Sequence, residues 1–211
     1  MRSKIIVVAI LVVLSNGIQA QDFLPGSIVT NDGDTIKCMI KSAKWDINPN
    51  RIVTKTGDKN KKYWPTEIAS FQVNNRTYVS ARVRLDVSNH MDGTLDLSDS
   101  RPKFANDSIF AEQIFAGNKS LYRYKSPSYK LHFLISAQPG WLESLIYKRY
   151  LIWVDVVAGK TFKQVAYNEE YKNQLELFFA DCPGFKDKIK VTGYDAGQLT
   201  SLFGLYHRCS N

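Results

Sequence analysis

The sequence lacks the short motifs by which many enzymes are recognised. It contains no Gly-x-Ser-x-Gly elbow, no His-Glu-x-x-His motif, no glycine-rich phosphate loop and no Cys-x-x-Cys pair. Histidine is scarce, and its 3 residues lie far apart along the chain. His132 falls within an apolar strand pattern, where a structural histidine is expected more often than a ligand or a base. The sequence therefore indicates no catalytic residue, no metal site and no cofactor.

The sequence also lacks an apolar run long enough to span a bilayer as a helix, which takes roughly 20 residues. Its longest apolar run covers residues 5–14 and follows the basic residues Arg2 and Lys4. This pattern predicts a signal peptide over residues 1–20, with cleavage before Gln21. No cysteine lies at the cleavage point, so lipid attachment is not expected there. We expect an exported protein of the periplasm or outer cell surface, with no transmembrane segment after cleavage.

The rest of the chain, residues 21–211, shows no repeat, no low-complexity segment and no linker, so we expect a single exported domain. The formal net charge is +8, and the basic residues are spread along the chain rather than gathered in one patch. Export and this even spread argue against nucleic acid as a partner. A diffuse positive surface instead favours anionic envelope components, such as lipid headgroups or acidic glycans.

Cysteine is scarce too, and the odd number of 3 leaves one thiol unpaired. Cys182 and Cys209 each end a segment with helical periodicity, and we expect a disulfide between them in an oxidising compartment. Such a bridge stabilises a fold by roughly 3–4 kcal/mol in the chain-entropy model. A metal site that combines both cysteines with His207 matches no standard ligand spacing. Cys38 alternates with apolar residues and is expected to be the free thiol.

What the sequence has in abundance is alternation of apolar and polar residues, interrupted by turn residues roughly every ten positions. This pattern predicts an antiparallel β-meander over roughly residues 25–155. Its clearest hairpin joins 27–30 to 35–40 through Asp32-Gly33, because glycine allows the positive φ of a tight turn. Further turns are expected at Gly57–Asn60, Asn74-Asn75, Gly117-Asn118 and Gln138–Gly140.

The last predicted hairpin pairs residues 129–135 with 141–153. Beyond it the period changes to that of amphipathic helices. A first helix is indicated by the apolar stripe over 171–182, and a second begins at Asp195, whose side chain forms a capping box with Gln198. A meander followed by two C-terminal amphipathic helices packed on it gives an α+β fold.

Aromatic side chains are the remaining candidates for a binding surface. Tyr122 and Tyr124 share one face of a predicted strand and, with Trp141, are the candidate positions of a stacking platform for a sugar or peptide. The alternative is that such aromatics cover the sheet or pack beneath the helices. Three aspartates in the loop at 88–106 superficially suggest calcium, but turn formation explains their spacing better.

The segment Gly26–Lys37 reads Gly-Ser-Ile-Val-Thr-Asn-Asp-Gly-Asp-Thr-Ile-Lys. It resembles the opening of a Bacteroidetes exported domain whose members begin with a G-x-I-x-x-x-x-G-D-T-I-x-G hairpin and often precede an outer-membrane β-barrel. Shorter similar pieces include Tyr63-Trp64-Pro65, Asp181-Cys182-Pro183, and Tyr206 with Cys209. Members commonly have glycine at the position of Cys38, which agrees with a free thiol there. The resemblance implies no established activity and no catalytic residues.

These observations together predict a non-enzymatic cell-envelope module that binds or scaffolds another component. Its expected partner is an outer-membrane β-barrel protein or an anionic envelope glycan or lipid. The alternative is a small periplasmic hydrolase of cell-wall or imported polysaccharide, whose acidic residues are placed by the fold rather than by a motif.

Overall fold

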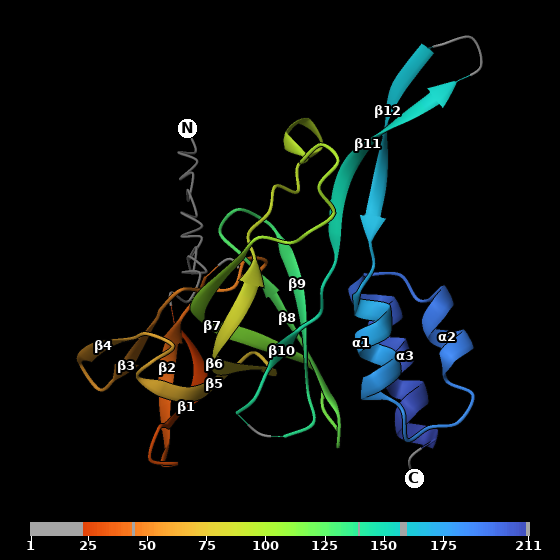
Figure 1. Cartoon of the computed structure of the whole chain (residues 1–211). Coiled ribbons are helices and arrows are strands. Elements are labelled where there is room, and N and C mark those ends of the chain that lie inside the picture. The colour runs from red at the N-terminus through yellow and green to blue at the C-terminus, as the bar shows by residue number, and fades with distance from the viewer. Residues whose placement is uncertain (1–22, 44, 139, 157–159, 210–211) are drawn as a thin grey trace, which may run out of the picture.

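The computed structural model describes residues 23–43, 45–138, 140–156 and 160–209. The predicted signal peptide with its cleavage site, and Pro139 of a predicted turn, lie outside these residues. Within them the chain forms one large antiparallel sheet, a separate two-stranded ribbon and three α-helices (Figure 1). The protein is therefore of the α+β class, as predicted.

The ten-stranded sheet has the order β4-β3-β2-β1-β5-β6-β7-β8-β9-β10. Its strands are β1 (Phe23–Thr30), β2 (Thr35–Lys41), β3 (Ile52–Thr56), β4 (Lys59–Tyr63), β5 (Ile68–Val73), β6 (Arg76–Asp86), β7 (Phe104–Phe115), β8 (Ser120–Lys125), β9 (Leu131–Ser136) and β10 (Glu143–Ser144). Strands that follow one another in the sequence pair with each other, except that β5 pairs with β1 rather than with β4. The sheet thus consists of two meanders, β1–β4 and β5–β10, that meet where β1 pairs with β5.

Two glycines explain the N-terminal hairpin. Gly33 has a φ of +93°, the left-handed conformation that the predicted Asp-Gly turn requires. Gly26 lies within β1, where a Cβ atom would come within 2.4 Å of the Gln72 carbonyl oxygen and 2.8 Å of the Ile40 side chain. Close packing therefore requires glycine at position 26, and backbone conformation favours it at position 33.

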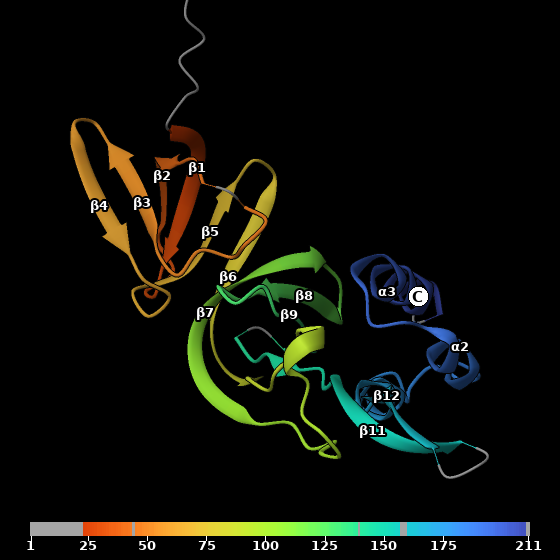
Figure 2. The ribbon, with the colours of Figure 1, turned by 90° about the horizontal axis from the view of Figure 1, so that it is seen from above.

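Three apolar clusters stabilise the molecule. The first lies on the β1–β6 half, where the rings of Phe71 and Tyr78 stack 4.6 Å apart. The second lies on the inner face of the curved half, β6–β9, which Figure 2 shows from above. The third lies between β8, β9 and the helices, because Leu121 and Phe133 point to the opposite face.

The predicted pairing of residues 129–135 with 141–153 is confirmed only at Leu134 and Ile135, which pair with Ser144 and Glu143 of β10. Beyond β10, Leu145 is buried in the helix-side cluster and the chain leaves the sheet, so the rest of the predicted pairing is wrong. The next strand, β11 (Lys148–Val156), pairs over nine positions with β12 (Lys160–Asn168) as a separate ribbon. This long ladder satisfies more backbone groups than a continued pairing with the six-residue β9 offers. Strand β12 was absent from the sequence prediction.

The C-terminal part has three helices rather than two: α1 (Tyr171–Phe178), α2 (Lys186–Val191) and α3 (Ala196–Cys209). Helix α2 escapes prediction because its six residues bury only Ile189, too few for a periodic pattern. At α3, the Gln198 amide donates to Asp195 Oδ1 at 3.0 Å, as the capping box predicts. The side-chain oxygen of Gln198 accepts a hydrogen bond from the backbone amide of Gly193, whereas in a capping box it would accept one from the amide of Asp195. None of the described helices is long and apolar enough to cross a membrane.

The predicted disulfide between Cys182 and Cys209 is confirmed, and it ties the end of α3 to the segment that follows α1. Cys38 is a free cysteine in a half-buried position. Burial raises the pKa of the Cys38 thiol and so lowers its reactivity at neutral pH.

The loop between β6 and β7 contains a short 3-10 helix, η1 (Asp92–Thr94), and attaches the ribbon to the sheet. Asp96 accepts from the fully buried Lys148 at 2.8 Å and from Lys103 at 3.0 Å, and Asp92 accepts from Arg149 at 2.5 Å. The loop aspartates therefore form ion pairs, which is a structural role.

Gly26→Ala is expected to lower the free energy of unfolding by about 1–3 kcal/mol, because the new methyl group must displace Ile40 or the β5 backbone. Urea unfolding measures this change. The matched control is Gly204→Ala in α3, where nothing lies within 4 Å of the added Cβ, so stability should stay equal or rise. Equal stability of the two variants would contradict the packing argument.

Replacement of Cys182 and Cys209 together by serine is expected to cost about 3 kcal/mol of stability, since the bridge restricts the unfolded chain. Cys38→Ser serves as the control and should change stability by less than about 1 kcal/mol. Denatured, non-reduced wild type should react with one equivalent of a thiol reagent, and Cys38→Ser with none. More than one equivalent in the wild type rules out the disulfide.

Candidate functional site

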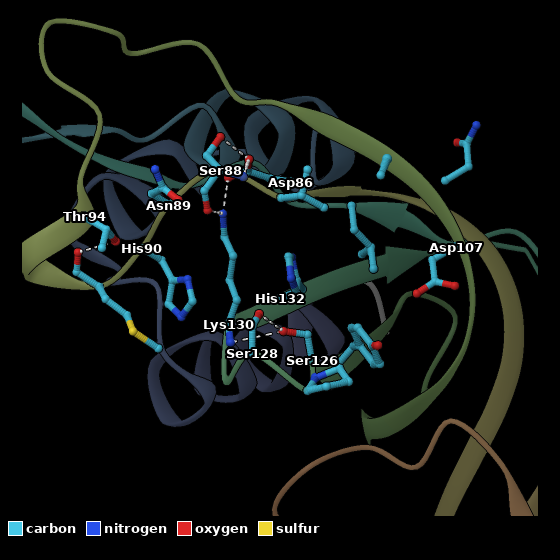
Figure 3. Close-up of a pocket in the computed structure, with 17 residues that line it drawn as sticks. Asp86, Ser88, Asn89, His90, Thr94, Asp107, Ser126, Ser128, Lys130 and His132 are labelled. Atoms are coloured by element: carbon cyan, nitrogen blue, oxygen red, sulfur yellow. Dashed lines mark hydrogen bonds and ion pairs between the residues drawn. The ribbon is translucent and has the colours of Figure 1, made fainter.

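A pocket of about 370 Å³ opens where the loop after β6 meets the turn between β8 and β9 (Figure 3). Its floor and walls come from the end of β6, the start of β7 and the beginning of β9. We call it the histidine pocket; it is lined chiefly by Asp86, Ser88, His90, Tyr124, Lys130 and His132.

Lys130 extends along the pocket and forms a buried ion pair with Asp86. Its Nζ lies 2.6 Å from Asp86 Oδ2 and 2.9 Å from the Ser88 carbonyl oxygen. The other carboxylate oxygen accepts from the amide and hydroxyl of Ser88 at 2.9 and 2.5 Å. Burial acts to raise the pKa of Asp86, but the hydrogen bonds from Lys130 and Ser88 outweigh it and hold that pKa below its ordinary value. The ion pair fixes the loop after β6 against the start of β9.

His132 lies in the pocket with 4% of its surface exposed and its ring centroid 5.9 Å from that of Tyr124. Burial, aided by the positive charge of Lys130, lowers the pKa of His132 to about 4. Burial also lowers the pKa of His90, although a hydrogen bond with the Ser128 backbone opposes the shift. Burial raises the pKa of Tyr124 to about 12. At neutral pH the pocket thus presents uncharged rings, one compensated ion pair and, at its exposed margin, the carboxylate of Asp107.

The two carboxylates of the histidine pocket are already engaged. Asp86 is bonded through both oxygens, and the exposed Asp107 accepts a hydrogen bond from the Ser108 amide at 2.8 Å. Within the described residues, no group of three or more His, Cys, Asp or Glu side chains is arranged to hold a metal ion. The polar contacts of this pocket chiefly hold the end of the sheet together.

A second hollow follows an edge of β6. Strand β5 pairs with β6 only over residues 76–79, so residues 80–86 pair with β7 alone. The segment 140–146 lies across from this edge, and two cavities of about 550 and 600 Å³ occur between them. Both cavities are lined by Arg82 and Leu142, so they adjoin. We call these two adjoining cavities together the seam groove.

Positive charge in the seam groove comes from Arg82 and Arg84, both exposed and two residues apart on β6. Their cross-strand partners on β7 are the uncharged Ser108 and Asn106. The ion pairs among the described residues involve neither arginine. The guanidinium of Arg84 lies 4.2 Å from the ring centroid of Phe104. Stacking of this kind orients a guanidinium and leaves its N–H groups free for a ligand.

Trp141 lines the same groove with 73% of its surface exposed. Of the three predicted platform residues it is the one whose ring reaches solvent. Tyr122 and Tyr124 are only 8% and 6% exposed in the inner apolar cluster, so neither ring offers an open face for stacking, although Tyr122 lines one cavity of the groove. They cover the inner face of the sheet, as the alternative held, but on the side away from the helices.

The two arginines escaped the sequence analysis. A signal was available, because Arg82 and Arg84 alternate with the apolar Val83 and Leu85 and must therefore share the outward face of their strand. That Trp141 lies across from them depends on how the chain returns after β9, which no local pattern reports. Comparison with known proteins adds no assignment: no family model, curated protein or solved structure matches the chain.

The histidine pocket predicts acid sensitivity. The folded-state pKa of His132 is about 4, against an ordinary value of 6.5, so below pH 6.5 the unfolded chain binds a proton that the folded chain refuses. Stability should therefore fall between pH 6.5 and 4, by up to about 3 kcal/mol from this group. Urea unfolding at pH 7.5, 5.5 and 4.5 should show a smaller loss for His132→Gln than for wild type.

The control for this prediction is Tyr124→Phe, which removes a hydroxyl beside His132 whose pKa is raised to about 12 by burial, so that it does not titrate in this pH range. It should keep the acid sensitivity of the wild type. If His132→Gln loses as much stability as the wild type between pH 6.5 and 4, the buried neutral histidine is not the cause.

Proposed function

We propose that this protein is a non-enzymatic, exported cell-envelope module that binds an anionic glycan in the seam groove. The observation that carries the proposal is the exposed ring of Trp141 in one groove with the guanidinium groups of Arg82 and Arg84, which form no ion pair with the described residues. An aromatic face and fixed positive charges are the two elements that an acidic sugar chain needs from its receptor.

The chemistry of these side chains favours an acidic sugar over other ligands. Guanidinium groups bind carboxylate, sulfate or phosphate through paired N–H donors, with charge-assisted strength. An indole ring packs against the apolar face of a sugar and keeps its N–H for a hydrogen bond. The two adjoining cavities give the groove the length for more than one sugar unit. Without Arg2 and Lys4 of the predicted signal peptide the net charge falls from +8 to +6, which still attracts anionic chains from a distance.

Export supports a ligand of the envelope. The signal-peptide pattern, the hairpin resemblance and the Cys182–Cys209 disulfide all agree with an oxidising compartment outside the cytoplasm. Hydrolysis of a glycan would need two carboxylates directed at one bond. Among the described residues of the seam groove, Glu143 is the single acidic side chain, which favours binding without cleavage. A β-barrel protein as partner stays a prediction from the sequence.

The test is calorimetric titration with three polymers of similar length: polygalacturonate, dextran sulfate and neutral dextran. We expect binding of at least one acidic polymer and none of dextran. Arg82→Gln and Arg84→Gln should each weaken binding roughly tenfold, because each removes a charged hydrogen-bonding group. Trp141→Ala should weaken it about fivefold.

The chain offers a matched control in Arg51 and Trp64, where a guanidinium lies 5.4 Å from the centroid of an indole that is 41% exposed. Arg51→Gln and Trp64→Ala remove the same side-chain types outside the seam groove, and should leave affinity unchanged. Equal losses from the two sets of variants would mean diffuse electrostatic attraction. No binding of either acidic polymer would overturn the proposal.

A further inference from the structure

The β11–β12 ribbon projects away from the sheet and the helices (Figure 1). It is attached at its base. Backbone hydrogen bonds join Leu151 to Asp96 and Ser98 at 2.9 and 2.7 Å, and the Asn168 side chain donates to the Ser100 carbonyl at 3.0 Å. The ion pairs of Lys148 and Arg149 with the β6–β7 loop reinforce this base. These attachments involve residues 148–151 and 168, so the part that follows Leu151 extends beyond them.

The extended part carries exposed apolar groups on both faces. Trp153 is 53% exposed and lies opposite Lys163 in the ladder. Phe162 is 47% exposed and lies opposite Val154, one position along the ladder from that pair. Since side chains alternate between the faces of a ribbon, Trp153 and Phe162 point in opposite directions.

A two-stranded ribbon is marginally stable in water, and large apolar groups on it are normally covered. A protein partner that packs on one face would bury either Trp153 or Phe162 and leave the other in water. The interfacial zone of a bilayer, in contrast, surrounds an inserted ribbon on both faces. Two-sided exposure therefore favours lipid as the environment.

Charge supports the same environment. Lys160 and Lys163 are exposed on β12, and the Lys163 ammonium lies 5.2 Å from the ring centroid of Trp153. Lysine beside an indole is the combination found at membrane interfaces, where the ring lies among the headgroups and the ammonium reaches phosphate. Asp155 is exposed beside Thr161 and limits insertion to a shallow depth.

From these observations we infer that the projecting part of the ribbon is a membrane-interface anchor that inserts Trp153 and Phe162 among the headgroups of an anionic lipid surface. Lys160 and Lys163 bind the lipid phosphates. This site is separate from the seam groove, and it stands whether or not the groove binds a glycan.

The experiment is co-sedimentation of the signal-less protein with vesicles of phosphatidylethanolamine and phosphatidylglycerol in equal parts, compared with pure phosphatidylcholine. We expect binding to the anionic vesicles that weakens with salt. The double variant Trp153→Ser with Phe162→Ser should lose at least tenfold in affinity. Lys160→Gln and Lys163→Gln should each lose roughly fivefold on anionic vesicles.

Insertion is separated from surface attraction by lipids brominated in the acyl chain. They should quench the fluorescence of the wild type, and Trp153→Phe should bind with much weaker quenching. Because the substituted groups are exposed, the variants should keep the unfolding midpoint of the wild type.

The control is Trp141→Ala, which removes an exposed indole of the seam groove and should bind vesicles like the wild type. Reciprocally, the ribbon double variant should keep the acidic-polymer binding of the groove. Failure of the wild type to bind anionic vesicles, or equal binding by wild type and the ribbon double variant, overturns the anchor.

Discussion

The register of β6 is the constraint on which the other features depend. This strand has eleven residues, of which the first four pair with β5, while pairing with β7 extends over residues 78–86. It therefore links β5 to β7 and at the same time leaves an unshared edge. That edge forms one wall of the seam groove, and its outward alternation places both arginines there. At the end of the same strand the buried Asp86 forms an ion pair with Lys130 in the histidine pocket.

Two buried ion pairs, Lys130–Asp86 and Lys148–Asp96, hold the loop after β6 against β9 and against the ribbon. Desolvation of Lys130, Asp86 and Lys148 costs about as much free energy as their pairing returns, so such pairs add little net stability. They do specify geometry, because either partner left alone in the interior would be strongly unfavourable. Lys148 thereby attaches the ribbon to the acidic loop, and Lys130 attaches that loop's start to β9.

Features that depend on a few neighbouring residues, such as turns and helix caps, could be predicted from the sequence. The Asp32-Gly33 and Asn74-Asn75 turns are present, with positive φ at Gly33 and at both asparagines, and the Asp195 cap begins α3. The Cys182–Cys209 bridge was also predictable from the count and the helical periodicity. The incorrect part of the strand pairing arose because the local pattern fits more than one partner strand equally well. An alternating run from Trp141 to Trp153 fits any antiparallel neighbour, and only the competition between β9 and β12 settled which one it has.

The sequence by itself determined the class of fold, the turns, the disulfide and the alternation that places arginine outward and valine inward on β6. These depend on backbone conformation and on a period of two or 3.6 residues, which neighbouring residues set. Only the tertiary structure decided that Tyr122 and Tyr124 are covered while Trp141 stays open, and that the indole lies across from two arginines. Such pairings depend on which distant segments share an edge, and that is a property of the whole packed chain.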